Sequence, residues 1–178
     1  GRIAFGRNEN IPEGYRGGLS QWDFGAFKTD GVIRSLTTNN YVRASYNNAY
    51  GTNVFLSSNI VLAQGVTDRR VGYSFTDADG DSYFICILYQ QSDGKYYVQG
   101  VSRDGSAGGY EIWEYKKELS AEYSALLTSD DGLPFAVRYQ DGMFTFWVND
   151  MLFDDGVISR KSDWSTNAFG TGVAVAPG

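Results

Sequence analysis

The 178-residue chain contains no histidine, one cysteine and few prolines. Without histidine, no Ser-His or Cys-His nucleophile pair can form, and the usual zinc sites cannot be assembled. The single cysteine, Cys86, cannot form a disulfide within the chain, and its apolar neighbours indicate a small core residue. These absences remove the commonest hydrolytic and zinc-dependent chemistries from consideration.

The chain also lacks an excess of basic residues and any long apolar run. It has 15 Lys and Arg against 21 Asp and Glu, which gives a net charge of −6. Nucleic-acid binding needs a basic surface that neutralises phosphates, so we expect no nucleic-acid partner. No apolar run approaches the roughly 20 residues of a membrane-spanning helix, so we expect no membrane insertion.

Aromatic residues and glycine are abundant, which is typical of β-sheet proteins: aromatics make up 16% of the chain, and there are 22 glycines. Strand patterns are clearest in residues 71–75, 83–89 and 95–101. The middle run is apolar on both faces, as expected of a central strand. Asp-Gly pairs between the runs supply the positive φ angles that tight turns need, so we predict a three-stranded antiparallel meander.

The rest of the chain continues this pattern. Residues 133–139 and 143–149 alternate around a third Asp-Gly pair, and shorter strands are predicted at 53–56, 60–62 and 151–153. From residue 116 onwards the period changes to helical spacing, with Ser120 as a possible cap. We predict an all-β protein, a two-sheet antiparallel jelly-roll sandwich with one short helix near residues 118–127.

The order of these features resembles the concanavalin A-like lectin/glucanase fold and, more narrowly, the laminin G-like jelly rolls of bacterial secreted and cell-surface proteins. The resemblance covers roughly residues 19–176 and is carried best by the segment GLPFAVRYQDGMFTFWVNDMLF at 132–153. Asn149-Asp150 stands there in place of the usual Asp-Gly or Asn-Gly. The resemblance implies an architecture and a secreted or cell-surface location, and it carries no catalytic signature.

We expect one jelly-roll domain over residues 1–178, with a loop-rich lead at 1–20. The chain begins at Gly1 and not at Met, so we expect a domain excised from a longer protein. The oligomeric state is left open.

One turn concentrates acidic residues. Asp77, Asp79 and Asp81 bring three carboxylates together, and calcium takes several oxygen ligands of this kind. The spacing differs from that of helix-loop-helix calcium loops. A calcium site and a solvated hairpin tip are therefore the two interpretations of this turn.

Aromatic residues opposite the predicted core face are candidates for ligand binding. Trp147 and Trp113 lie on such faces, and Trp164 lies in a polar loop predicted at 162–167. Sugars present apolar C–H faces that stack on aromatic rings, with polar groups around them. We expect Trp147 or Trp113 to bind a neutral or weakly basic glycan, with Arg138 and Tyr97 as neighbours from adjacent strands.

Three functions remain open at this point. The first is a non-catalytic carbohydrate-binding module, and the second is an adhesion or structural domain that binds a cell-surface protein. Catalysis comes third, because the Glu-x-Asp pattern of the laminarinase-like enzymes of this fold class is missing and Asp150, Asp154 and Asp155 are expected in a solvated loop.

Overall fold

The structure is a computed structural model of the chain. Backbone and side chains are described for residues 53–62, 71–73, 75, 88–100, 115–140 and 143–154. For the other strand residues named below, the backbone path alone is described.

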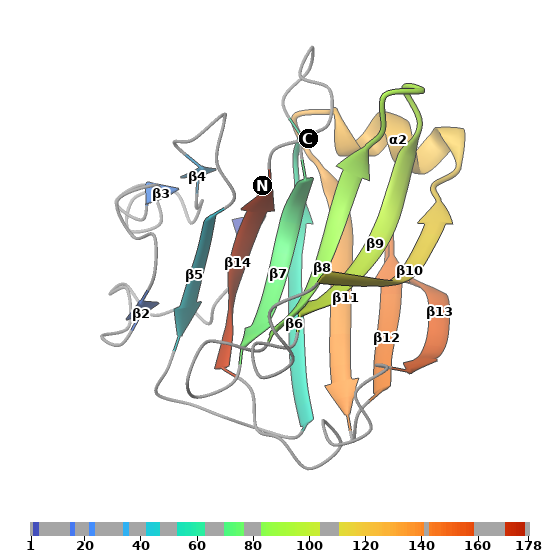
Figure 1. Ribbon diagram of the computed structural model, residues 1–178. Coiled ribbons are helices and arrows are strands. Elements are labelled where there is room, and N and C mark those ends of the chain that lie inside the picture. The colour runs from blue at the N-terminus through green and yellow to red at the C-terminus, as the bar shows by residue number, and fades with distance from the viewer. Residues whose placement is uncertain are drawn as a thin grey trace.

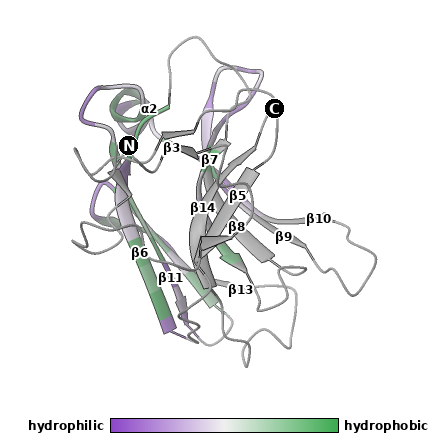
Figure 2. Ribbon diagram, turned by 90° about the vertical axis from the view of Figure 1, so that its left-hand side faces the viewer, coloured by the Kyte–Doolittle hydropathy of each residue, from purple (hydrophilic) through white to green (hydrophobic). Residues whose placement is uncertain are grey.

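Two antiparallel sheets form a sandwich (Figures 1 and 2), which confirms the predicted fold class. The first, sheet A, has the strand order β1 (Arg2–Ile3), β6 (Asn53–Ile60), β11 (Leu133–Gln140), β12 (Met143–Val148) and β13 (Met151–Ile158). Figure 2 shows β6 and β11 in one layer and β14, β8 and β9 in the other. The neighbours β6 and β11 are far apart in sequence, which is typical of a sandwich with crossing connections.

The second sheet, sheet B, contains the predicted meander. Its strand order is β10 (Glu111–Glu118), β9 (Tyr96–Arg103), β8 (Tyr83–Gln90), β7 (Arg70–Thr76), β14 (Gly170–Ala176), β5 (Val42–Tyr46) and β2 (Tyr15–Arg16). The hairpin turn between β8 and β9 forms as predicted, with Gly94 at φ +83°. A separate two-stranded ribbon pairs β3 (Trp22–Asp23) with β4 (Arg34–Ser35).

The core lies between the two sheets and follows the predicted alternation. On β11 every second residue from Leu133 to Tyr139 is buried, while the residues between them are partly exposed. Large aromatic side chains from both sheets meet in the core: Tyr73, Phe75, Phe135, Tyr139, Phe144 and Phe146. The rings of Tyr73 and Phe135 stack across the core, and the Tyr73 hydroxyl donates to the main-chain oxygen of Phe135 at 2.7 Å. This contact joins the two sheets.

The predicted helix is α2 (Ala121–Leu127), which starts three residues after the predicted onset because residues up to Glu118 belong to β10. Ser120 caps it as predicted, since its side chain accepts a hydrogen bond from the main-chain N–H of Tyr123. Leu127 anchors the helix in the core. Among the described residues no helix is long and apolar enough to cross a membrane.

Two other local predictions are wrong in detail. Residues 53–60 form one strand, β6, and not two short ones, because its pairing with β11 continues through the polar residues Ser57 to Asn59. Asp154 and Asp155 lie in β13 and not in a loop. Long-range pairing overrides the local polar composition in both places.

Side chains tie the edge strands β10 and β13 together. The Tyr115 hydroxyl donates to Asp154 Oδ2 at 2.9 Å, and Lys117 Nζ lies 3.7 Å from the same oxygen. Lys117 Nζ also donates to the main-chain oxygen of Phe153 at 3.0 Å. Burial, followed by the hydrogen bond to Asp154 and the charge of that carboxylate, raises the pKa of Tyr115 well above its usual range. These contacts hold β13, the last strand of sheet A, against sheet B.

Candidate functional site

The outer face of sheet A presents a continuous row of side chains across four strands. Register pairs Ser57 on β6 with Ala136 on β11, Ala136 with Trp147 on β12, and Trp147 with Leu152 on β13. Directly paired residues of an antiparallel sheet share a face. Phe146 and Val148, the sequence neighbours of Trp147, are buried, so Trp147 itself points outward. We call the four residues Ser57, Ala136, Trp147 and Leu152 the Trp147 row.

Two neighbours hold the Trp147 indole. The ring centroids of Trp147 and Phe55 are 5.8 Å apart in an edge-to-face arrangement. The Arg138 guanidinium carbon lies 5.6 Å from the centroid of the Trp147 ring, close enough for a cation–π contact. Arg138 comes from the strand next to Trp147, as predicted, and its Nε is buried without a hydrogen-bond partner. The indole is therefore fixed from two sides before any ligand binds.

A shallow hollow lies beside the indole. Its volume is about 270 Å³, slightly below the usual range of small-molecule pockets. It exists because Ala136 and Ser57 are small side chains between the larger Trp147 and the far end of β6. The lining residues are Ser57, Ser58, Asn59, Pro134, Phe135, Ala136, Trp147 and Asp150. The lining thus combines apolar groups, including the Trp147 indole, with hydroxyl, amide and carboxylate groups.

The turn after β12 brings Asp150 to the hollow. Asn149 and Asp150 have φ angles of 52° and 63° and form the two-residue turn between β12 and β13. Two consecutive positive φ angles are the mark of a type I′ hairpin turn, and Asn and Asp tolerate them better than other side chains do. The N–H of Asn149 donates to the main-chain oxygen of Pro134 at 2.8 Å. This bond places the turn against the start of β11, next to the hollow.

Asn59 is held at the other end of the hollow. Its Nδ2 donates to the main-chain oxygen of Asp131 at 3.1 Å. With the amide nitrogen engaged in this way, the side-chain oxygen is the group that can accept a hydrogen bond from a ligand.

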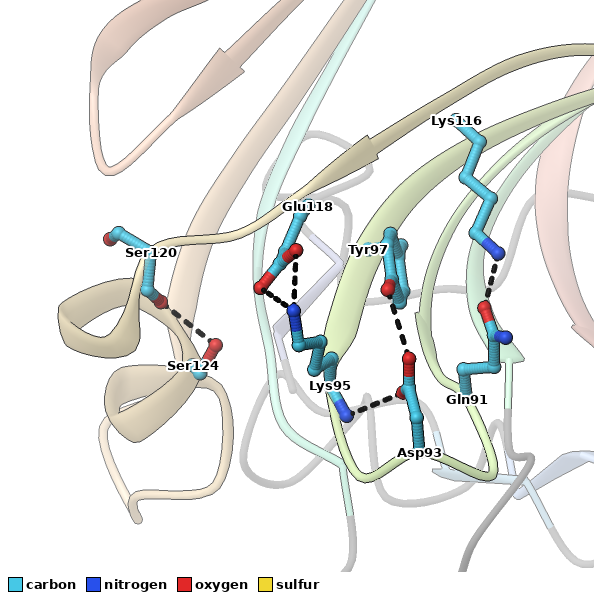
Figure 3. A network of polar contacts seen from close by, with 8 residues as sticks. All are labelled: Gln91, Asp93, Lys95, Tyr97, Lys116, Glu118, Ser120 and Ser124. Atoms are coloured by element: carbon cyan, nitrogen blue, oxygen red, sulfur yellow. Dashed lines mark hydrogen bonds and ion pairs between the residues drawn. The ribbon is translucent and has the colours of Figure 1, made fainter.

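Tyr97 lies in sheet B, away from the Trp147 row. Its hydroxyl donates to Asp93 Oδ2 at 3.1 Å, and the ammonium of Lys116 stands 4.3 Å from its ring centroid. Figure 3 shows the hydrogen bond from Tyr97 to Asp93 together with the ion pair between Lys95 and Glu118, whose closest atoms are 3.0 Å apart. Desolvation, followed by the hydrogen bond to Asp93, raises the pKa of Tyr97. The structure therefore separates Tyr97 from Trp147 and Arg138 and places it in a network that braces the β8–β9 hairpin.

Comparisons with known proteins bear on the fold. The sequence matches no protein-family model and no curated protein. The structure is similar to the carbohydrate-binding module CBM66 from Bacillus subtilis, with a TM-score of 0.62 and 13% identity over 92% of each chain. The chain has the concanavalin A-like fold.

Two further solved structures are similar to a comparable degree. An alginate lyase in complex with an alginate trisaccharide has a TM-score of 0.57 and 15% identity, over 90% of this chain and 75% of that chain. The CBM2 module of an evolved Dit protein from a Lactobacillus casei phage has a TM-score of 0.54 and 14% identity, over 97% and 86%. At these identities the likeness establishes the architecture and leaves the function open.

The remaining expected site residues of this concanavalin A-like chain lie elsewhere. Trp113 belongs to β10 of sheet B, where its backbone pairs with Val101, so Trp113 and Trp147 are on different sheets. Trp164 and the three acidic residues Asp77, Asp79 and Asp81 fall outside the described residues. In the part of the chain whose side chains are described, no three acidic or cysteine residues come close enough to hold a metal ion.

Sequence patterns alone did not identify Ser57, Asn59 and Asp150 as neighbours of Trp147. Ser57 and Asn59 reach the site through the register between β6 and β11, which no local pattern encodes. Asp150 could have been suspected, because an Asn-Asp pair directly after a Trp strand in a concanavalin A-like hairpin marks a tight turn beside that Trp.

Proposed function

We propose that the protein is a non-catalytic carbohydrate-binding module, and that a sugar ring binds in the hollow beside Trp147. The observation that carries the proposal is the partly exposed indole, held by Arg138 and Phe55, next to a hollow with polar walls. This combination suits a sugar, which has an apolar C–H face and hydroxyl groups around its edge.

The polar groups of the hollow complement hydroxyl donors. Asp150 offers a carboxylate, Asn59 offers its side-chain oxygen, and Ser57 can both donate and accept. Hydrogen bonds from sugar hydroxyls to a carboxylate are stronger than those between neutral groups. The site is shallow, so we expect weak affinity, on the order of micromolar to millimolar.

Binding without hydrolysis fits the charges of the hollow. Glycoside hydrolysis uses a pair of carboxylates about 5–10 Å apart. Among the residues that line the hollow, Asp150 carries the one carboxylate. Two of the similar structures bear the description of carbohydrate-binding modules, which supports the same choice, and two others, an endo-glucanase and an alginate lyase, are enzymes.

We further propose a secreted or cell-surface location, where the protein would encounter a glycan.

The competing function is an adhesion domain that binds a surface protein. Exposed apolar side chains on the same face, Phe55 and Met143, are the observation that would favour it.

The test is a glycan-array screen of the intact protein, followed by titration of the retained glycan while tryptophan fluorescence is recorded. Replacing Trp147 by Ala removes the stacking surface and should weaken binding by about ten-fold or more. The matched control is Trp113→Ala, which removes a tryptophan from the other sheet and should leave the affinity unchanged. Circular dichroism should show both variants to be folded.

Two results would count against the proposal. If no glycan is retained, carbohydrate binding by this domain is refuted. If a glycan binds and Trp113→Ala abolishes binding while Trp147→Ala does not, the site lies on sheet B.

A further inference from the structure

Beyond the hollow, on the far side of Trp147, the outer face of sheet A carries the exposed apolar side chain of Leu152. Leu152 pairs directly with Trp147 and is 60% exposed. β13 is the last strand of the sheet, so Leu152 stands at its border. Strands lie about 4.8 Å apart, so the row from Ser57 to Leu152 spans roughly 14 Å. One sugar ring cannot cover this length, whereas a short stretch of a polysaccharide can.

The size of the surface argues against a second copy of the chain as its occupant. Phe55, Met143 and Leu152 are the large apolar side chains exposed on this face, at 56%, 43% and 60%. Together they leave roughly 300 Å² of apolar area, but not as one patch, because the buried Thr145 separates Met143 from Trp147 on this face. A stable dimer buries about 800 Å² on each partner, of which somewhat more than half is apolar, and these side chains supply less than that apolar share.

The charges of the face point to an uncharged ligand. Asp150 brings a negative charge to the hollow, and the whole chain has a net charge of −6. The one nearby cation among the described residues, Arg138, lies over the Trp147 ring, and its Nε is buried. A carboxylated or sulfated glycan would therefore meet repulsion from Asp150 at the hollow, and Arg138 is not among the residues that line the hollow.

We propose that this face binds an internal stretch of a neutral polysaccharide, laid across the strands from Ser57 to Leu152, and not a single terminal sugar. The inference rests on the proposed function and adds the ligand class and the binding direction. One ring occupies the hollow against Trp147. The rings that follow place their apolar faces over Leu152 and leave the sheet at β13.

The experiment compares affinities within length series of neutral glucan, mannan, galactan and fructan oligosaccharides, with alginate oligosaccharides as the anionic comparison. Leu152→Ala is the variant. Met151→Ala is the matched control. Met151 is 64% exposed and belongs to the same hairpin, but it pairs with the buried Val148, so its side chain leaves the backbone on the opposite face of the sheet. Both side chains are exposed, so both variants should fold as the parent does.

For the neutral series that binds, affinity should rise about ten-fold from the monosaccharide to the longest oligosaccharide. Leu152→Ala should reduce that gain by at least about three-fold and leave monosaccharide binding unchanged. Met151→Ala should change neither the gain with length nor the monosaccharide affinity. Equal affinity at all lengths, an unaltered length dependence in Leu152→Ala, or tighter binding of alginate would each overturn the inference.

The two proposals fail in different ways. Monosaccharide binding that depends on Trp147 but not on chain length overturns the extended ligand and keeps the binding module. Failure of every series overturns both, and self-association that Leu152→Ala abolishes would then assign the face to a second copy of the chain.

Discussion

Two glycines with similar positive φ angles provide a test of how closely the end of β6 approaches the start of β11. Gly94 and Gly132 have φ angles of +83° and +76°. A Cβ at Gly94 would meet nothing within 4 Å, whereas one at Gly132 would lie 2.9 Å from the main-chain oxygen of Ile60 and 2.9 Å from Cγ2 of Val61. The Val61 methyl group can rotate away, but the carbonyl of Ile60 belongs to the end of β6 and cannot move alone.

The cost of each Gly→Ala substitution follows from these contacts. The left-handed conformation costs an alanine about 1–2 kcal/mol, and the lower entropy of the unfolded chain offsets about 0.4–1 kcal/mol of it. Gly94→Ala should therefore lower the free energy of unfolding by about 1 kcal/mol. At Gly132 the forced shift of β6 adds about 1–3 kcal/mol, as overpacking does in other cores. The difference between the two variants isolates the steric part.

Urea denaturation followed by circular dichroism measures both free energies of unfolding, and thermal melts give a second readout. At about 2–4 °C per kcal/mol for a chain of this size, Gly132→Ala should melt about 2–12 °C below Gly94→Ala. If the two variants are equally stable, the strand end at Ile60 does not lie against Gly132, and the placement of β6 beside β11 would be wrong. The hollow beside Trp147 depends on that placement.

Two further predictions concern the contacts between the sheets. Tyr73→Phe removes the hydrogen bonds that the Tyr73 hydroxyl makes with the main-chain oxygen of Phe135 and with Ser58 Oγ, and should lower the free energy of unfolding in urea by about 1–2 kcal/mol; an unchanged value would mean that these bonds do not contribute in solution. The pKa of Tyr115 is raised in the folded chain, so the unfolded chain loses this proton first, and stability should fall as the pH rises above about 10. Tyr115→Phe should show a smaller loss between pH 8 and pH 11 than the parent, and an equal loss would refute the contribution of Tyr115.

Local patterns were sufficient to predict most strands and their faces. Side chains alternate along a strand, so the apolar residues of 133–139 and 144–148 mark the core face without reference to any partner strand. The same alternation assigns Trp147 to the outer face. Turns also follow from local chemistry, because Gly94 occupies a position with positive φ that most side chains avoid.

The sequence by itself therefore determined the class of fold, the strand faces and the presence of an outward-facing Trp beside Arg138. The tertiary structure decided which strands share a sheet, and that separated Tyr97 from Trp147 and brought Ser57 and Asn59 to the site. It also turned Asp154 from an expected loop residue into a partner of Tyr115. The physical reason is that the face of a residue depends on its own strand, whereas its neighbours depend on a register between distant segments, which is set by the packing of the whole core.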